Sequence, residues 1–223
     1  MKVIKIKDDV VIAIIDSGID NTVNQLGNHI IDSIGFDFSN NGDKIEMHTN
    51  ITHRHPHGTR VATIIKNSFS NVKFIDINIL DENLSSDGRI LIRAFNQAIS
   101  YKPDIIHMSL GTNKWRYKHQ LKKSVLNAID NKIIVVSAAD NSGAKSYPAY
   151  LNNVIGVKDS MMAKTMYYSD DFFYAPGNTY IKNSLNKKEM VRANSFAAAY
   201  ITGEIAKLIY KNDIQGDEKK LRI

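Results

Sequence analysis

The sequence contains no cysteine among its 223 residues. Disulfide bonds, thiolate metal sites and a cysteine nucleophile are therefore all excluded. It also has no apolar run long enough to span a bilayer, and no charged-then-apolar signal peptide opens it. We accordingly expect no membrane association and a cytoplasmic protein, or a secreted one if a pre-region has been trimmed from this chain.

Internal repeats, linkers and low-complexity tracts are missing as well, which is typical of one domain at this length. We expect a single domain over residues 1–223, with a charged C-terminal tail from about residue 211. The net charge is +6, but the lysines are spread along the chain and form no basic block interleaved with aromatic residues. The expected partners are therefore peptides or proteins and not nucleic acid, whereas the oligomeric state is left open.

What the sequence does contain is an alternation of short apolar runs and helical patterns. Four β-branched runs predict strands buried on both faces: Val10–Ile15, Val72–Ile79, Ile105–Met108 and Ile133–Ser137. Four other segments predict helices: Gly58–Asn67, Gly88–Ser100, Trp115–Asn131 and Ser195–Tyr210. Before Val10, alternating residues predict an edge strand. The fold class is thus α/β, a doubly wound, mainly parallel sheet with helices on both faces, whose functional crevice lies at the carboxyl ends of the strands.

Asp16 stands at the end of the first predicted strand and precedes a Ser-Gly turn. Alone, such an aspartate is as well explained by a turn-initiating residue as by a catalytic one. A phosphoryl-transfer domain of the receiver or dehalogenase type would need a second acidic residue nearby, and the sequence has none in either pattern.

Four histidines lie within ten residues: His48, His53, His55 and His57. They could form a zinc site, a solvated loop or the setting of one catalytic imidazole. Zinc ligands must converge tetrahedrally, and the first three histidines follow no fixed period. His57 instead precedes Gly-Thr at a predicted helix start, where the helix dipole favours the neutral imidazole that a general base requires.

Ser195 begins an alanine-rich predicted helix, as either its N-cap or a nucleophile whose oxyanion would lie by the free backbone N–H groups. Asn141 follows a predicted strand and is either a loop residue or an oxyanion donor. The chain order Asp, His, Asn, Ser is that of one arrangement of serine peptidase residues.

With these residues in place, the chain resembles the subtilisin-like serine peptidases, the S8 family, from about Val10 to Leu208. The matching segments are IAIIDSGID, HPHGTRVATII, IIHMSLG, IVVSAADNSG, SYPAYLNNVIGV, FYAPG and ANSFAAAYITG. The last aligns with the family motif GTSMAAPHVAG, so that Ser195 falls on the nucleophile and Gly203 on a family glycine.

The resemblance implies a serine endopeptidase that needs no cofactor and no catalytic metal. Ser195 would attack the scissile carbonyl, His57 would take its proton and Asp16 would orient the imidazole. Asn141 and the backbone N–H of Ser195 would bind the oxyanion. A dedicated processing enzyme, such as a leader peptidase, is one role that this compact chain suggests.

The resemblance also implies a substrate edge at Ser109, Leu110 and Gly111, to which an extended peptide would add as a strand. Asp140 replaces a family glycine on a segment that helps to wall the S1 pocket. It would either pair with a basic P1 residue, the one before the scissile bond, or point to water as a loop carboxylate. The loop that commonly binds structural calcium in the family is absent, so we expect that calcium site to be missing.

Other departures from the family surround the nucleophile. Ala193 and Asn194 stand where the family has Gly-Thr before the nucleophile. Ala199-Tyr200 stands where the family has a proline after the run of small residues. These changes motivate a second hypothesis, a catalytically impaired, peptide-binding relative. The retention of all three triad residues and Asn141 favours the active enzyme, since a binding protein has no physical need for them.

Overall fold

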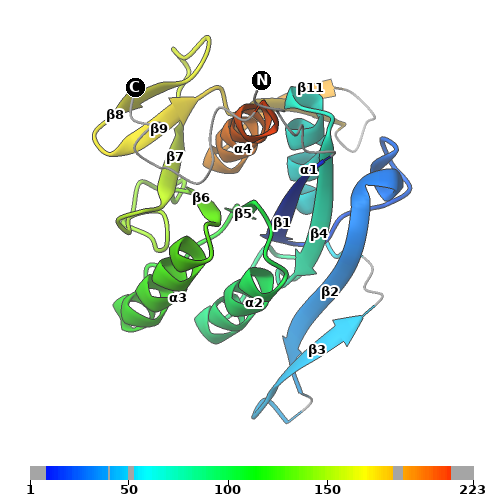
Figure 1. The fold of residues 1–223 in the computed structure, drawn as a ribbon, viewed down its shortest axis with the longest axis vertical. Coiled ribbons are helices and arrows are strands. Elements are labelled where there is room, and N and C mark those ends of the chain that lie inside the picture. The colour runs from blue at the N-terminus through cyan, green and yellow to red at the C-terminus, as the bar shows by residue number, and fades with distance from the viewer. Residues whose placement is uncertain (1–8, 40, 50–52, 183–187, 212–223) are drawn as a thin grey trace, which may run out of the picture.

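The computed structural model describes residues 9–39, 41–49, 53–182 and 188–211. The edge strand expected before Val10 and the charged tail expected after Lys211 lie outside these residues. Nine strands form one sheet in the order β3-β2-β4-β1-β5-β6-β7-β9-β8 (Figure 1). Only the outer pairs β2–β3 and β8–β9 are antiparallel, and all other neighbours are parallel. The predicted fold class is confirmed.

The centre of the sheet consists of the strands that the apolar runs predict. These are β1 (Val10–Asp16), β4 (Val72–Asn78), β5 (Ile105–Met108) and β6 (Ile134–Ala138), each within one residue of its predicted bounds at either end. Helices cover both faces, which explains why these strands have no polar alternation.

The remaining strands were not predicted. Those of the sheet are β2 (Ile30–Phe38), β3 (Ile45–Thr49), β7 (Ile155–Asp159), β8 (Tyr167–Ser169) and β9 (Phe172–Ala175). A separate hairpin pairs β10 (Asn178–Lys182) with β11 (Lys188–Arg192). Most of these strands are short or partly exposed, and their sequences carry neither a continuous apolar run nor a clean alternation.

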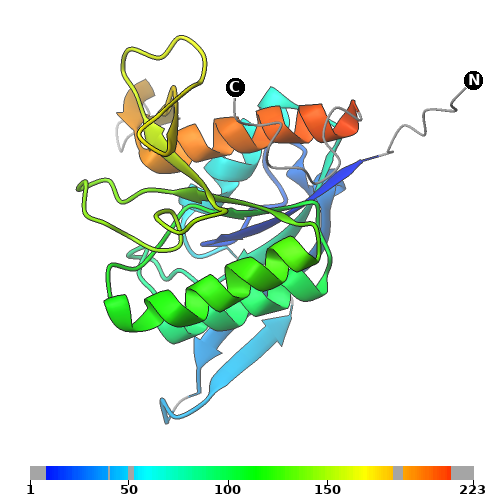
Figure 2. The same ribbon diagram turned by 60° about the vertical axis from the view of Figure 1, so that its left-hand side comes forward.

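Figure 2 shows helices α2 (Gly88–Ser100) and α3 (Lys118–Asp130) on one face of the sheet, and α1 (Pro56–Ser68) and α4 (Asn194–Tyr210) on the other. The helix predicted over Trp115–Asn131 is instead divided into a 3₁₀ turn, Trp115–Tyr117, and α3. At this break the buried ring of Tyr117 packs on Gly88 at the start of α2, where even a Cβ atom would come within 2.3 Å of it.

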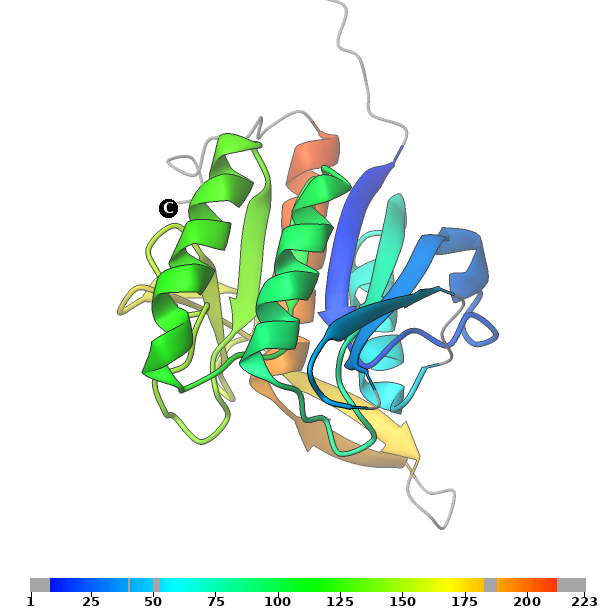
Figure 3. The same ribbon diagram turned by 90° about the horizontal axis from the view of Figure 1, so that it is seen from below.

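Helix α4 is apolar on nearly all sides and packs directly against both the sheet and α1. Gly203 makes this approach possible, since a Cβ atom there would lie 2.4 Å from the Cβ of Ser68 in α1. The beginning of α4 and the β10–β11 hairpin lie at the edge of the sheet toward which β1 points (Figure 3). This edge collects the carboxyl ends of the parallel strands, where the crevice of such a fold is expected.

In the described part of the chain, no helix is both long and apolar enough to cross a membrane.

Asp76 is a charged-type residue inside the central strand β4, with an exposed fraction of 2%. Burial, with a smaller contribution from the neighbouring charge of Asp16, raises its pKa to about 7. Oδ2 accepts from the Ile19 amide at 3.1 Å and from the Ser33 hydroxyl at 3.0 Å. Within the described residues Oδ1 has no hydrogen-bond partner. The folded state therefore favours the neutral, protonated carboxyl.

We expect Asp76→Asn to stabilise the protein at alkaline pH. With the pKa at about 7 folded and about 3.9 unfolded, the carboxyl's contribution to the free energy of unfolding is fully present below about pH 4. It is lost as the pH rises through 7. Urea unfolding should show a gain on the order of 2 kcal/mol at about pH 8 and little change near pH 4. The exposed Asp130→Asn serves as control, and an equal gain from Asp76→Asn at both pH values would contradict this assignment.

Candidate active site

The predicted site residues meet at the carboxyl edge of the sheet. Asp16 ends β1, His57 and Ser195 are the second residues of α1 and α4, and Asn141 follows β6. A cavity of about 370 Å³ opens there. It is lined by every predicted site residue except Asp16: His57, Ser109, Leu110, Gly111, Asp140, Asn141 and Ser195.

Asp16 lies behind His57 and is fully buried. Its Oδ1 and Oδ2 atoms lie 2.8 and 3.0 Å from Nδ1 of His57. The backbone N–H of Ser17 also donates to Oδ1 at 2.7 Å. Because a carboxylate only accepts hydrogen bonds, Nδ1 must carry the proton and Nε2 is left as the basic nitrogen. A carboxylate enclosed in this way offers no open oxygen for phosphoryl transfer.

The interaction between Asp16 and His57 lowers the pKa of the carboxyl and raises the pKa of the imidazole. Burial alone would raise the pKa of Asp16, but the charge and hydrogen bond of His57 outweigh it and lower the pKa. Burial likewise would lower the pKa of His57, but Asp16 outweighs it and raises the pKa above the ordinary 6.5. The helix N-terminus favours the neutral imidazole, but the adjacent carboxylate has the opposite effect, and the overall shift of the His57 pKa is upward.

His55 has a structural task that the sequence analysis missed. It is the N-cap of α1, and its Nδ1 accepts from the backbone N–H of His57 at 3.1 Å. Pro56 is the first residue of the helix, a position that proline favours. The His-Pro-His order contains this signal, since the residue before such a proline is the natural N-cap. His55 thereby fixes the start of the helix that carries His57.

The other histidines of the cluster diverge. His48 lies in β3 opposite Gly35, and Nε2 of His53 lies 3.8 Å from the carboxylate of Asp20. Among the described residues, no three side chains of the metal-ligating types come together in a way that could hold an ion. The arrangement therefore gives the zinc-hydrolase hypothesis no support.

Ser195 is 5% exposed, and its hydroxyl donates to the carbonyl of Ser109 at 3.2 Å. No hydrogen bond between Ser195 and His57 is present in the described residues. The N-cap alternative for Ser195 is wrong, because α4 begins one residue earlier and its cap position is Ala193. The Ser195 backbone N–H lies in the first turn, where it has no acceptor within the helix and is free to donate to a bound group.

Asn141 lines the same cavity, and its side chain is oriented by a backbone donor. Its Oδ1 accepts from the N–H of Asn194 at 2.9 Å. The orientation of the amide follows from this bond, since an N–H group can only be met by the oxygen. Nδ2, with its two hydrogens, is therefore the group left to donate to a ligand.

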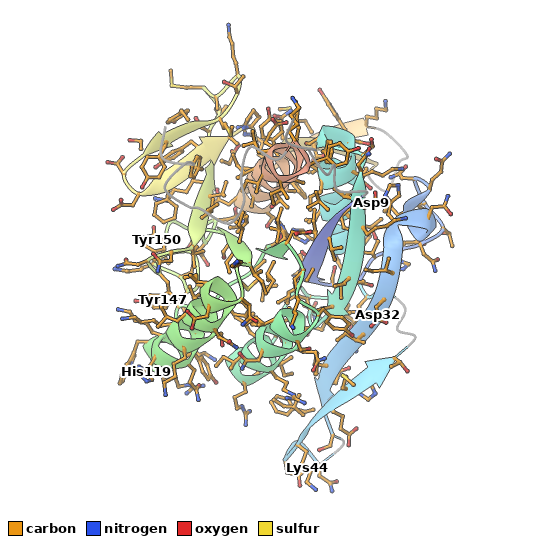
Figure 4. All side chains as sticks on the ribbon, viewed as in Figure 1. Asp9, Asp32, Lys44, His119, Tyr147 and Tyr150 are labelled. Atoms are coloured by element: carbon orange, nitrogen blue, oxygen red, sulfur yellow. The ribbon has the colours of Figure 1, made fainter. Side chains whose placement is uncertain are left out.

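The predicted substrate edge follows β5. Just beyond it, Thr112 pairs with Tyr147 through two backbone hydrogen bonds of 2.8 and 2.9 Å. Figure 4 labels Tyr147 on the segment after β6. A Cβ atom on Gly111 would approach the Tyr147 carbonyl to 2.8 Å, so only glycine fits there without displacement. Asp140 lines the cavity, but its Oδ1 accepts from the backbone and hydroxyl of Ser142 in its own loop.

His107 is a fully buried imidazole that the sequence analysis did not single out. Its Nδ1 lies 2.8 Å from the hydroxyl of Thr202 in α4, and its Nε2 lies 2.7 Å from the hydroxyl of Ser109. Thr202 already donates its hydroxyl hydrogen to the Ala198 carbonyl, so it must accept from Nδ1. Nε2 then accepts from Ser109, and burial lowers the pKa of His107 to about 4, in keeping with a neutral ring.

Comparison with known proteins matches this site to a family. Residues 7–222 fit the model of the subtilase family, Peptidase_S8. The chain is 30% identical to the major intracellular serine protease of Bacillus subtilis, over 94% of this chain and 71% of that protein. It is 28% identical to the minor extracellular protease Epr of the same organism, over 59% of this chain and 23% of that protein.

Two solved structures share the fold. One is the epidermin leader peptide processing serine protease of Staphylococcus aureus, with a TM-score of 0.76, 18% identity and coverage of 96% of this chain and 68% of that one. The other is the nisin leader peptidase NisP of Lactococcus lactis, with a TM-score of 0.76, 20% identity and coverage of 98% and 82%. The family match spans all of the described residues, including the Asp16–His57 pair and the start of α4, and this chain belongs to the subtilase family.

Proposed function

We propose that this protein is a serine endopeptidase that uses Ser195 as nucleophile, His57 as general base and Asp16 as the residue that orients His57. The observation that carries the proposal is the buried carboxylate bound to Nδ1 of His57, which leaves Nε2 basic beside a cavity that Ser195 also lines. In the reaction, Ser195 releases the Ser109 carbonyl, attacks the substrate carbonyl and passes its proton to Nε2. His57 then protonates the leaving amine, and a water hydrolyses the acyl-enzyme.

The negative oxygen of the tetrahedral intermediate would lie between Nδ2 of Asn141 and the backbone N–H of Ser195. The Ser195 N–H lies in the first turn of α4, whose dipole favours a negative charge, and Asn141 in the loop after β6 is bound to the same helix start through the Asn194 N–H. The substrate is a peptide or protein segment in extended form, which would pair along residues 109–111. These residues line the cavity that holds the proposed nucleophile, and this supports the assignment.

Within this class we propose a processing role, such as removal of a leader segment from a precursor peptide, in the cytoplasm. Support comes from the fold, which the epidermin and nisin leader peptidases share. A relative named an intracellular protease supports the cytoplasmic location. One domain over residues 1–223 is also part of the proposal, supported by the single family match over residues 7–222.

We expect the protein to be labelled by a fluorophosphonate probe and Ser195→Ala to lose the label, because only an activated serine hydroxyl forms the covalent adduct. Incubation with a diverse peptide library, with cleavage sites determined by mass spectrometry, should show turnover that falls by at least about 10⁴-fold in Ser195→Ala. Folded wild-type protein that neither takes the label nor cleaves any peptide would favour the impaired, peptide-binding relative instead.

The pH profile of kcat/KM should have an acid limb above 6.5, since His57 must be neutral to act as base and Asp16 raises its pKa. Arg60 lowers the pKa of His57. Arg60→Gln should therefore move the limb to higher pH, whereas Asp16→Asn should move it to lower pH and also reduce kcat by about 10⁴-fold. Limbs that stay unchanged in both variants would show that His57 is not the group that titrates.

The preference at P1 stays a prediction that rests on Asp140. If its free carboxylate oxygen reaches the cavity, peptides with P1 arginine should be cleaved faster than those with P1 leucine, and Asp140→Ala should remove the difference. An Asp171→Ala variant, which changes an exposed carboxylate outside the cavity, is the control. Equal rates for both peptides in the wild-type protein would instead show Asp140 to be a loop carboxylate held by Ser142.

A further inference from the structure

Asn194, the residue directly before the nucleophile, joins three segments through one side chain. Its Nδ2 donates to the carbonyl of Ala139 at 3.0 Å and to that of Asp140 at 3.2 Å. Its Oδ1 accepts from the backbone N–H of Asp159 at 2.7 Å. Both the NH₂ group and the oxygen of this amide thus have partners. The NH₂ group binds the loop after β6, and the oxygen binds the end of β7.

The backbone of Asn194 holds the same loop at a third point. Its N–H donates to Oδ1 of Asn141 and so orients the Nδ2 group toward the cavity. Three consecutive residues, Ala139 to Asn141, are therefore bound to the one residue that immediately precedes Ser195. Asn141 itself is exposed, so surrounding side chains do not pack it into place.

Asp159, the partner of the Asn194 amide oxygen, is itself held by ionic and hydrogen-bonding contacts. The carboxylate of Asp159 accepts from the guanidinium of Arg192 at 2.6 and 2.9 Å and from the N–H of Gly177 at 2.6 Å. Arg192 ends β11, two residues before Asn194. The start of α4 is thereby tied to the end of β7 both by its own amide and through the preceding strand.

We infer that Asn194 is a positioning residue that sets the oxyanion hole by fixing the distance between the Asn141 amide and Ser195. This inference rests on the proposed peptidase function. Oxyanion donors act only when they lie about 2.7–3.1 Å from the developing charge, so a shift of the 139–141 loop by a few tenths of an ångström weakens them. The side chain needs two donors and one acceptor at once, which an amide supplies and a hydroxyl or carboxylate does not.

Two variants of Asn194 test the inference. Asn194→Ala removes all three side-chain bonds, whereas Asn194→Asp keeps the acceptor for the Asp159 N–H and places a carboxylate oxygen against two carbonyls. Both should lower kcat by about 10–100-fold with KM within about threefold. Binding of a peptide aldehyde, whose adduct with the serine places an oxyanion in the hole, should weaken by a similar factor.

A double-mutant cycle with Asn141→Ala separates positioning from general destabilisation. If Asn194 acts through Asn141, Asn194→Ala should cost less than about threefold in kcat once Asn141 is already alanine. Equal costs in both backgrounds, or an unchanged kcat per active site after fluorophosphonate titration, would overturn the inference. Should Asn194→Ala not fold, as judged by thermal unfolding, the same cycle with Asn194→Asp decides.

The matched control is Asn131→Ala. The Asn131 amide also donates to a backbone carbonyl, that of Asn127 at 2.8 Å, but it follows the end of α3 at the opposite edge of the sheet. This variant should keep wild-type kcat. A wild-type protein without any peptidase activity would refute the proposed function itself. An active wild-type protein whose Asn194 variants keep its kcat would refute the Asn194 inference alone.

Discussion

The structure of the site depends on one buried interaction, that between the carboxylate of Asp16 and the imidazole of His57. A carboxylate with no exposed surface is costly unless its oxygens are bound, and removing one partner of such a pair leaves an uncompensated charge. Ser17 supplies further donors. Gly58 allows the close approach of α1, because a Cβ atom there would lie 2.6 Å from the Gly18 carbonyl. The Asp-Ser-Gly turn and the His-Gly start of α1 therefore both help to hold Asp16 and His57 in contact.

The two imidazoles of the site, His57 and His107, differ in their partners and therefore in their pKa. His57 faces a carboxylate, and this carboxylate raises its pKa, as suits the proton transfer that we propose for it. His107 lies close enough for Asp16 and His57 to affect its pKa, but its direct partners are hydroxyl groups. Burial therefore dominates and lowers its pKa to about 4. Only one of the two rings is suited to proton transfer near neutral pH, and the other is suited to a fixed hydrogen-bonding role.

The sequence predicts the central strands and the residues at their ends because continuous β-branched runs leave few alternatives. It also places Asp16, His57 and Ser195 at one edge, since parallel strands and their following helices share it. The His-Pro-His order does contain the signal for the N-cap role of His55, because its partner lies only two residues away. The role of Asn194 could not be predicted in this way. Its side-chain partners lie 35 to 55 residues away in the chain, where periodicity carries no information. Tyr117 shows the same limit for the fold, because α3 begins only at Lys118, later than the helical pattern predicts, where the ring of Tyr117 packs on Gly88.

The proposed nucleophile and the proposed substrate edge are joined in a closed ring of interactions. The Ser195 hydroxyl donates to the Ser109 carbonyl, and the Ser109 hydroxyl lies on His107. The ring continues to Thr202, which stands two helical turns beyond Ser195 in α4 and donates back to its own helix. Any sliding of the edge past α4 must lengthen at least one of these bonds. A peptide that paired with the proposed edge would therefore lie at a fixed distance from the serine oxygen. The serine would change its acceptor by side-chain rotation while the edge stayed bound through His107.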